Sequence, residues 1–379
     1  MTTAREGDAA ARPVGAAGAS PTEPTIASLD ARLIRVPLTR PWAADVTSVG
    51  VIATHVVRSD GAEGWGFSWT PQIGAEAVQA LLAHDIAAFA AGRTADPSAL
   101  WRDAWRHLHE AGGGGITTIA LAGLDLALWD AAARARDLPV SELLGRRRAS
   151  VRAYGSGVNL HYPQDQLVAQ VRRWVDAGFD AVKIKVGKPD VREDADRLAA
   201  VREVLGPDRA LMIDANQRWD LGRATAAMEV LAAYQPAWIE EPLRADDLAA
   251  HRQLARRTDI PIALGENLHT VHRFREAMDA GAAVLQPNVV RVGGITPFLE
   301  IAREVRDAGH TLAPHLLPEL SAQLAFALPE ACWIEDVEDA RFATLGALAE
   351  EPGLVFDGGW VSGGPERGLG IRFHEEVAP

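Results

Sequence analysis

The feature that most constrains this chain is a series of seven short apolar runs, each closed by a polar cluster, between residues 183 and 335. The clusters are, in order, Lys183-Ile184-Lys185, Asp214-Ala215-Asn216, Glu240-Glu241-Pro242, Gly265-Glu266-Asn267, Pro287-Asn288, Pro314-His315 and Ile334-Glu335. They follow one another at intervals of 20 to 29 residues. A strand, a loop, a helix and a second loop together take about 25 to 30 residues, so the interval predicts repeated βα units.

The same region predicts eight strands that are apolar throughout, which is typical of parallel strands buried on both faces. We expect them at 151–155, 181–186, 210–214, 237–240, 261–265, 283–287, 311–314 and 332–335. The fold class that follows is α/β, with a (β/α)8 barrel of the TIM type. The carboxyl ends of barrel strands form one ring, where active sites lie, so the polar clusters should meet in a single pocket.

The residues before the barrel lack this alternation. Strands are expected at 28–38, 50–59 and 64–68, followed by helices at 73–91, 97–109 and 117–136, an order that indicates an α+β domain. The last helix is apolar on most sides and should lie between two bodies. We therefore expect a disordered tail at 1–24, an α+β domain at 25–147, the barrel at 148–350 and a C-terminal segment, 351–379, that returns to and completes the first domain.

Composition excludes several classes of function. The net charge of −13 argues against binding nucleic acid through a general basic surface. The single cysteine, Cys332, excludes an internal disulfide, and its apolar neighbours predict a core position rather than a nucleophile. No apolar run approaches the ~18 residues of a membrane span, and residues 1–24 lack the apolar stretch of a signal peptide. We expect a cytoplasmic protein with no membrane partner.

Three acids, Asp214, Glu240 and Glu266, end three consecutive predicted strands. Without a cation they would repel one another and raise one another's pKa, whereas a hard divalent metal such as Mg²⁺ would bind all three through oxygen. The alternative is that each acid caps a helix or pairs with an arginine. Glu241 competes with Glu240 as the ligand, because the two side chains point in opposite directions along the strand.

Lys183 and Lys185 are two residues apart and should therefore face the barrel interior together. Lysine is rarely buried unless it is paired or functional, so the pair either balances the acids or supplies a general base beside a metal. His315 ends the seventh strand, across the ring from Lys185, and is a candidate for a second acid or base.

Taken together, these motifs resemble the enolase superfamily, specifically its mandelate racemase-like subgroup. The resemblance rests on the seven clusters above with Gln286 before Pro287-Asn288, on Val292-Gly293-Gly294-Ile295, on the segment from Leu124 to Asp130, and on Gly368-Leu369-Gly370. It covers nearly everything after residue 25. For the first domain it implies a cap over the barrel mouth, and for the oligomeric state it suggests a homo-oligomer.

The resemblance also implies a mechanism. Mg²⁺ would be held by Asp214, Glu240 and Glu266 and would bind the carboxylate of the substrate. Loss of the proton α to that carboxylate would give a metal-stabilised enediolate. The resemblance implies that Lys185 is the base on one face of the substrate and that Lys183 helps to hold the carboxylate. It implies that His315 is the acid or base on the other face and that Glu335 forms a hydrogen bond to the carboxylate.

One position departs from the subgroup. An aspartate that pairs with the histidine usually follows Gln-Pro, and here the residue is Asn288. Asparagine can accept a hydrogen bond and set a tautomer, but it supplies no negative charge to the imidazole. We therefore expect His315 to act mainly as an acid and Lys185 as the principal base.

The substrate should be small and carry a carboxylate. We expect Asn216, Trp42 and Trp69 to contact it, the last two from cap loops at 39–50 and 66–75, and the polar Ser68, Thr70 and Gln72 favour a polar ligand. The reaction that the resemblance implies is dehydration of a sugar acid. The alternatives are a racemase or epimerase of an α-hydroxyacid, a lactone cycloisomerase, and a carboxylate-binding protein that has lost catalysis.

Overall fold

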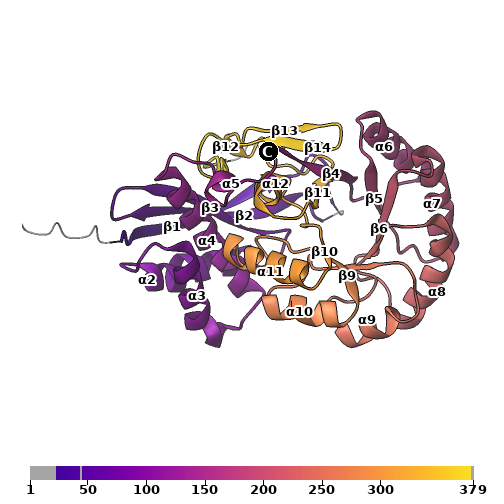
Figure 1. Ribbon diagram of the computed structural model, residues 1–379, viewed down its shortest axis with the longest axis horizontal. Coiled ribbons are helices and arrows are strands. Elements are labelled where there is room, and N and C mark those ends of the chain that lie inside the picture. The colour runs from indigo at the N-terminus through magenta and orange to yellow at the C-terminus, as the bar shows by residue number, and fades with distance from the viewer. Residues whose placement is uncertain (1–22, 43–44, 377–379) are drawn as a thin grey trace, which may run out of the picture.

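The computed structural model describes residues 23–42 and 45–376 and has the two-part architecture predicted from the sequence. A three-stranded antiparallel sheet with its helices lies beside a barrel sheet, and the outer helices curve around the barrel strands (Figure 1). The α/β fold class with an N-terminal cap is therefore confirmed. The predicted disordered tail, 1–24, lies almost entirely outside the described residues.

The cap begins with strands in the order β1-β2-β3 and continues into helices that pack on the sheet. Asp96 accepts a hydrogen bond from the Ala99 backbone N–H, and Pro97 follows it, so α3 begins with a well-formed cap. A π-helical turn at Leu82–Ile86 joins α1 to α2. The elements are β1 (Ile26–Pro37), β2 (Ser48–Arg58), β3 (Glu63–Thr70), α1 (Ala75–Leu81), α2 (Ala87–Ala90), α3 (Pro97–His107), α4 (Ile116–Arg134) and α5 (Val140–Leu143).

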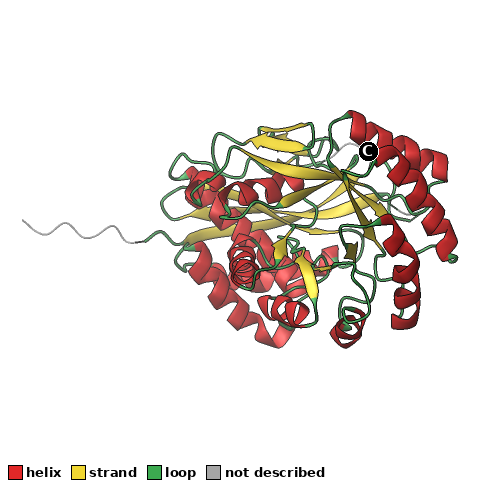
Figure 2. Ribbon diagram, turned by 45° about the vertical axis from the view of Figure 1, so that its right-hand side comes forward, coloured by secondary structure: helices red, strands yellow, loops and turns green. Residues whose placement is uncertain are grey.

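The barrel contains the eight predicted strands. Strands β4 to β10 pair in parallel in chain order, and β11 returns to pair with β4. The helices between them lie outside the strands (Figure 2). The strands are β4 (Ser150–Ser156), β5 (Ala181–Lys185), β6 (Ala210–Asp214), β7 (Ile239–Glu240), β8 (Ile262–Leu264), β9 (Ala282–Leu285), β10 (Thr311–Leu312) and β11 (Trp333–Val337). The helices are α6 (Gln164–Asp176), α7 (Val191–Leu205), α8 (Leu221–Leu231), α9 (Leu248–Leu254), α10 (Val271–Asp279), α11 (Ile295–Asp307) and α12 (Pro318–Ala327).

The C-terminal segment contacts both parts of the molecule. Its hairpin, β13 (Leu354–Asp357) and β14 (Trp360–Gly363), joins the barrel sheet through β4, whereas β15 (Arg372–Phe373) pairs with β12 (Leu348–Glu350). Phe373 packs edge-on against Phe67 of the cap, and the Leu369 N–H donates to Asp130 of α4 at 2.6 Å. The division at 147 and 350 stays a proposal, because the segment after 350 extends the barrel sheet as well as the cap.

Helix α4 lies in the core. It is long and apolar enough to cross a membrane by length and composition, which corrects the expectation that no run approaches that length. However, 89 % of its apolar window is buried inside the structure, packed between the cap sheet and the barrel, which is the position of a core helix. Cys332 is also buried as predicted, and burial raises the pKa of its thiol to about 12.

The cap is fixed to the barrel where α4 meets the N-terminus of α11. The buried Asp125 carboxylate accepts hydrogen bonds from the Thr296 backbone N–H at 3.0 Å and from its hydroxyl at 2.5 Å, and Trp129 donates to the same hydroxyl at 3.0 Å. Gly294 has φ of 114°, and a Cβ there would lie 2.3 Å from Asp125 Oδ2. Glycine at 294 therefore permits both the backbone conformation and the close approach of the two parts.

We predict that Gly294→Ala destabilises the protein by about 2–4 kcal/mol, because it combines backbone strain with a clash against a buried carboxylate. Gly309→Ala is the matched control, since Gly309 also has a positive φ, 76°, but nothing lies within 4 Å of its Cβ position. The control should cost about 1 kcal/mol. Urea unfolding measures both, and equal losses would contradict the role of Gly294 in docking.

Candidate active site

The predicted site residues lie at one level of the barrel because the parallel strands align them. Lys185 is the register partner of Asp214, and Asp214 is the partner of Glu240, so three successive strands end at the same height. On the other side of β5, Lys183 is the partner of Ser156, the last residue of β4. The strand ends therefore bring these side chains into one polar cluster inside an otherwise apolar barrel.

Lys183 is at the centre of this cluster and is 1 % exposed. Its ammonium lies 2.6 Å from Glu240 Oε2, 2.7 Å from Glu335 Oε1 and 3.8 Å from Asp214 Oδ2, and 5.6 Å from the centre of the Tyr154 ring. Burial by itself lowers the pKa of Lys183, but the Glu240 and Glu335 carboxylates raise it well above its usual value. The buried lysine is therefore a cation held between carboxylates.

Lys185 pairs with Asp214 through a short hydrogen bond to Oδ2. Burial lowers the pKa of the Lys185 ammonium, but Asp214 more than compensates, and the net direction is upward. The pKa is raised because the carboxylate faces the lysine directly. A divalent cation on Asp214 would compete with the ammonium for that carboxylate and would lower the pKa of Lys185.

Glu240 and Glu266 lie with His315 in a second group, whose nearest ligand atoms are all within 4.8 Å of one another. His315 Nε2 lies 2.7 Å from Glu266 Oε2. Glu240 Oε2 accepts hydrogen bonds from Lys183 and, at 2.7 Å, from Gln286. Each of the three predicted metal ligands thus faces a basic side chain: Asp214 faces Lys185, Glu240 faces Lys183 and Glu266 faces His315.

These acids suit a hard divalent cation. Glu240 Oε1 is buried and has no hydrogen-bond partner among the described residues, so one lone pair aimed into the cluster is unsatisfied. Burial and the Asp214 carboxylate raise the pKa of Glu240 to about 8. A carboxylate that is destabilised and unsatisfied in this way fits a bound Mg²⁺, which would take oxygen ligands from Glu240, Glu266 and Asp214.

Glu241, the alternative ligand, points away from Glu240. Its carboxylate accepts hydrogen bonds from Gln217 Nε2 at 2.8 Å and from Asn267 Nδ2 at 2.8 and 3.0 Å. Asn267 also donates to Glu266 Oε1 at 3.0 Å. The Glu241 carboxylate therefore has its hydrogen bonds supplied by amide side chains, and it orients Glu266 through Asn267. The sequence had left open whether Glu240 or Glu241 is the metal ligand, and this arrangement gives Glu241 a supporting position.

The orientation of Asn288 is set by the backbone. Its Oδ1 accepts hydrogen bonds from the Val290 and Arg291 N–H groups, both at 3.1 Å, so its NH₂ group faces His315 Nδ1, also at 3.1 Å. Asn288 thus donates to the imidazole. The sequence also allowed the opposite, that Asn288 accepts a hydrogen bond from the ring. A neutral ring that accepts at Nδ1 carries its proton on Nε2, which faces Glu266.

Glu335 is an acceptor in this arrangement. Its Oε1 accepts from Ser156 Oγ at 2.7 Å and from Lys183, and its Oε2 accepts from the Leu316 backbone N–H at 3.1 Å. Burial by itself raises the pKa of Glu335, but Lys183 and His315 lower it to about 2. The predicted hydrogen bond from Glu335 to a substrate carboxylate therefore stays a prediction, and it requires Glu335 to be protonated.

A cleft of about 1260 Å³ opens beside Lys185 and Asn216, where cap and barrel loops meet. Trp42 lines it, as expected for a substrate contact, together with basic and aromatic side chains that the sequence analysis did not single out. These side chains lie in loops without a periodic pattern. Only their position directly after β1, β4, β5 and β6 could have indicated from the sequence that they line the cleft. The described lining residues are Arg40, Pro41, Trp42, Val158, Leu160, His161, Tyr162, Gln166, Lys185, Gly187, Lys188, Pro189, Asn216, Arg218 and Arg223.

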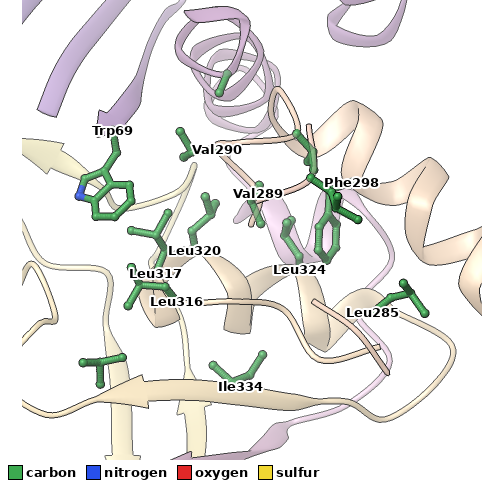
Figure 3. Close-up of a cluster of buried hydrophobic side chains, with 14 of the residues drawn as sticks. Trp69, Leu285, Val289, Val290, Phe298, Leu316, Leu317, Leu320, Leu324 and Ile334 are labelled. Carbon is green, nitrogen blue, oxygen red and sulfur yellow. The ribbon is translucent and has the colours of Figure 1, made fainter. Parts of the chain in front are cut away.

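Trp69 lies in the core instead of the cleft. It is 3 % exposed and packs in the buried cluster that includes Val290, Leu317 and Leu320 (Figure 3). Its ring lies edge-on to Trp42, 6.1 Å away, so it supports the residue that does line the cleft. The reason is that β3 extends to Thr70, which places the first half of the expected loop 66–75, residues 66–70, inside the cap sheet.

The polar residues expected on that loop are also occupied elsewhere. Ser68 is buried and donates to the Ile119 carbonyl at 2.6 Å, Thr70 is buried, and Gln72 donates to the Asp45 carbonyl at 3.1 Å. None of these three lines the described cleft. Of the expected loop 39–50, residues 43 and 44 lie outside the described part of the chain.

Comparison with known proteins agrees with this geometry. The mandelate racemase / muconate lactonizing enzyme N-terminal domain matches residues 29–145, and the enolase C-terminal domain-like family matches residues 166–377. The chain is 38 % identical to an L-talarate/galactarate dehydratase of Salmonella typhimurium, over 88 % of this chain and 82 % of that protein. It is 36 % identical to a 3,6-anhydro-alpha-L-galactonate cycloisomerase of Streptomyces coelicolor, over 81 % of this chain and 85 % of that protein.

A solved structure extends the likeness to the whole fold. The L-talarate dehydratase from Polaromonas sp. JS666, complexed with Mg and L-glucarate, superposes with a TM-score of 0.83. It is 34 % identical, and the match covers 93 % of this chain and 96 % of that one.

We predict that Mg²⁺ binding strengthens as the pH rises from 6 to 8. Glu240 must lose its proton to bind a cation, and its pKa of about 8 means that it is mostly protonated below that value. The apparent Kd should therefore fall by up to about tenfold per pH unit and level off above pH 8. Isothermal titration calorimetry with Mg²⁺ alone measures it.

Glu240→Gln should abolish this binding at every pH. Glu319→Gln is the matched control, because Glu319 is also buried, and burial raises its pKa to about 7, but it accepts from the Ala343 N–H outside the cluster. The control should keep both the affinity and its pH dependence. A wild-type affinity that does not change between pH 6 and 8 would contradict the assignment.

Proposed function

Because the chain belongs to the mandelate racemase/muconate lactonizing enzyme family of the enolase superfamily, we propose that it is a Mg²⁺-dependent dehydratase of a sugar acid. The observation that carries the proposal is the placement of Lys185 and His315 around one carboxylate cluster. Their strands, β5 and β10, are separated by β4 and β11 on one side and by β6 to β9 on the other. The two side chains can therefore reach a bound substrate from different faces.

We propose that Asp214, Glu240 and Glu266 bind Mg²⁺ and that the substrate binds the same ion through its carboxylate. When bound, the cation supplies positive charge that stabilises the negative charge which develops on that carboxylate as the α-proton is lost. Lys183 lies next to Glu240 and adds a fixed positive charge at the same point. Its complete burial keeps water away from the charge and strengthens the interaction.

Lys185 is the proposed base. It is the lysine of the pair that lines the cleft, and its side chain is 13 % exposed, against 1 % for Lys183. A base must reach the proton that it removes, and only Lys185 of the two reaches the substrate space. To act it must be neutral, so its hydrogen bond to Asp214 has to be weakened, as binding of a cation to Asp214 would do.

His315 is the proposed donor on the other face. Asn288 keeps a hydrogen-bond donor against Nδ1, so the neutral ring carries its proton on Nε2, and the imidazolium carries one there too. In both states His315 presents an N–H to the site and no free lone pair. The missing lone pair disfavours removal of a carbon-bound proton, whereas donation to a leaving hydroxyl requires the imidazolium. Burial by itself lowers the pKa of His315, but the Glu266 and Glu335 carboxylates raise it and so favour the imidazolium.

The same donor makes a cycloisomerase the second candidate, since opening a ring also needs a proton at a leaving oxygen. The similarity to a cycloisomerase of Streptomyces coelicolor supports this reading. A racemase is less consistent with the site, because it needs a base on both faces. Further proposals are a homo-oligomer, a cytoplasmic location and domain limits of 25–147, 148–350 and 351–379.

We predict that Lys185→Met lowers exchange of the substrate α-proton with solvent deuterium by about 10²–10⁴-fold, the range typical of a lost general base. Exchange is followed by NMR on a panel of sugar acids with Mg²⁺. Calorimetry should show that the variant still binds Mg²⁺, which separates loss of the base from loss of the metal site. Undiminished exchange in the variant would exclude Lys185 as the base.

We predict that Asn288→Asp adds exchange from the His315 face. One oxygen of an aspartate could accept from the Val290 and Arg291 N–H groups and the other from Nδ1–H, which would leave a lone pair on Nε2. The wild-type enzyme should exchange the α-proton of substrates of one enantiomeric series only, and the variant should exchange the α-proton of both series. Equal exchange of both series by the wild type would favour the racemase instead.

A further inference from the structure

The cleft beside Lys185 has a strongly basic lining. Five of its described lining residues are basic, namely Arg40, Lys185, Lys188, Arg218 and Arg223, and none is acidic, although the chain as a whole has a net charge of −13. A cleft lined by one sign of charge attracts ligands of the opposite sign, so this lining favours an anion. We propose that this cleft binds a second carboxylate, at the far end of the substrate, and that the enzyme therefore prefers dicarboxylic sugar acids to monocarboxylic ones. The inference rests on the proposed function.

Two of the five charges are already neutralised within the protein. Lys185 pairs with Asp214, and Arg40 lies 3.2 Å from Asp339 and 3.6 Å from Glu338 while donating to the Tyr162 hydroxyl. Their charges are therefore largely offset. The basic groups that remain are on the loops after β5 and β6.

Lys188, Arg218 and Arg223 have no carboxylate within ion-pairing distance among the described residues. The Arg223 guanidinium donates to the Lys188 carbonyl at 2.5 Å, which ties the two loops together. Of the acids near that loop, Asp190 pairs with Arg192 at 2.7 Å, and Asp194 is 1 % exposed and uses its carboxylate on the Gly187 and Lys188 backbone N–H groups. Asp194 therefore lies beneath the loop and does not face the cleft.

Arg218 has a defined place over this loop. Gly187 has φ of 112°, and a Cβ there would meet Arg218 Cδ at 2.7 Å. The arginine stem thus lies directly on the glycine, which only a residue without a side chain permits. Arg218 lines the cleft together with Asn216 and Lys185.

A carboxylate suits these groups because bidentate pairing with arginine is a favourable geometry for it. Phosphate sites commonly use the free N–H groups of a helix N-terminus. Two of the helices that begin beside the cleft, α7 and α8, are capped internally, because Asp190 accepts from the Arg192 N–H and Asp220 from the Arg223 N–H. The third, α6, begins after Pro163 without a side-chain cap, so a phosphate is the competing anion that the experiment must distinguish.

The test compares matched acids that differ at one end only. Full-length enzyme with Mg²⁺ is assayed on pairs of hexaric and hexonic acids of the same configuration, such as galactarate and galactonate. A second set compares gluconate, glucarate and 6-phosphogluconate, which differ in the group at the far end. Both α-proton exchange and kcat/KM are measured. We expect the best hexaric acid to exceed its hexonic partner by about 10- to 100-fold, the effect of charge-assisted hydrogen bonds to one carboxylate.

The variant Lys188→Gln/Arg218→Gln should reduce this ratio at least tenfold, mainly through KM for the diacid. Arg306→Gln is the control, because Arg306 lies at the end of α11, outside the cleft, and pairs with Asp307. It should leave the ratio unchanged. If Arg306→Gln reduced the ratio as much as the double variant does, the assignment of the second carboxylate to the cleft would be overturned.

The outcomes separate the two proposals. Exchange of hexonic acids equal to or faster than that of hexaric acids would overturn the inference and leave the proposed dehydratase intact. A preference for 6-phosphogluconate over glucarate would overturn the choice of carboxylate. If none of the acids exchanges its α-proton with Mg²⁺ bound, the proposed function itself fails and the inference fails with it.

Discussion

The pairing of three acids with three bases at the strand ends is the interaction on which the rest of the site depends. An isolated charge in the barrel would cost several kcal/mol in desolvation, and the cost is offset here because Lys183, Lys185 and His315 each face a carboxylate. The pairing holds the acids close together without a metal ion. In the proposed mechanism a metal would compete with these bases for the acids, so metal binding and activation of Lys185 would be coupled.

Much of this could be predicted from the sequence because a barrel converts spacing into proximity. Once Lys183, Asp214 and Glu240 are placed at the ends of successive buried strands, the fold leaves them few other places to point. Alternation along β5 was sufficient to place both lysines inside. The orientation of Asn288 could not be predicted, because it depends on two backbone N–H groups of the following turn.

The cap and its loops were less predictable for a related reason. Trp42 and Trp69 are both aromatic residues near the expected loops, and only the length of β3 decides that one lines the cleft and the other is buried. Lys188 and Arg218 lie in barrel loops, where no hydrophobic period indicates a direction. Sequence patterns report burial along regular elements, so they predicted the polar cluster at the strand ends well and the basic lining of the cleft poorly.

The pairing of β4 has a consequence for the order in which the chain can fold during synthesis. One edge of β4 pairs with β11, and the other is shared between β5 and β14. The Ser156 hydroxyl on β4 meets Glu335, 179 residues further along the chain. Strands β5 to β9 can pair with one another as they leave the ribosome, whereas β4 acquires most of its partners only after β11 and β14 have been synthesised. Closure of the barrel is therefore a late, long-range step, during which the first strand has an exposed edge open to aggregation.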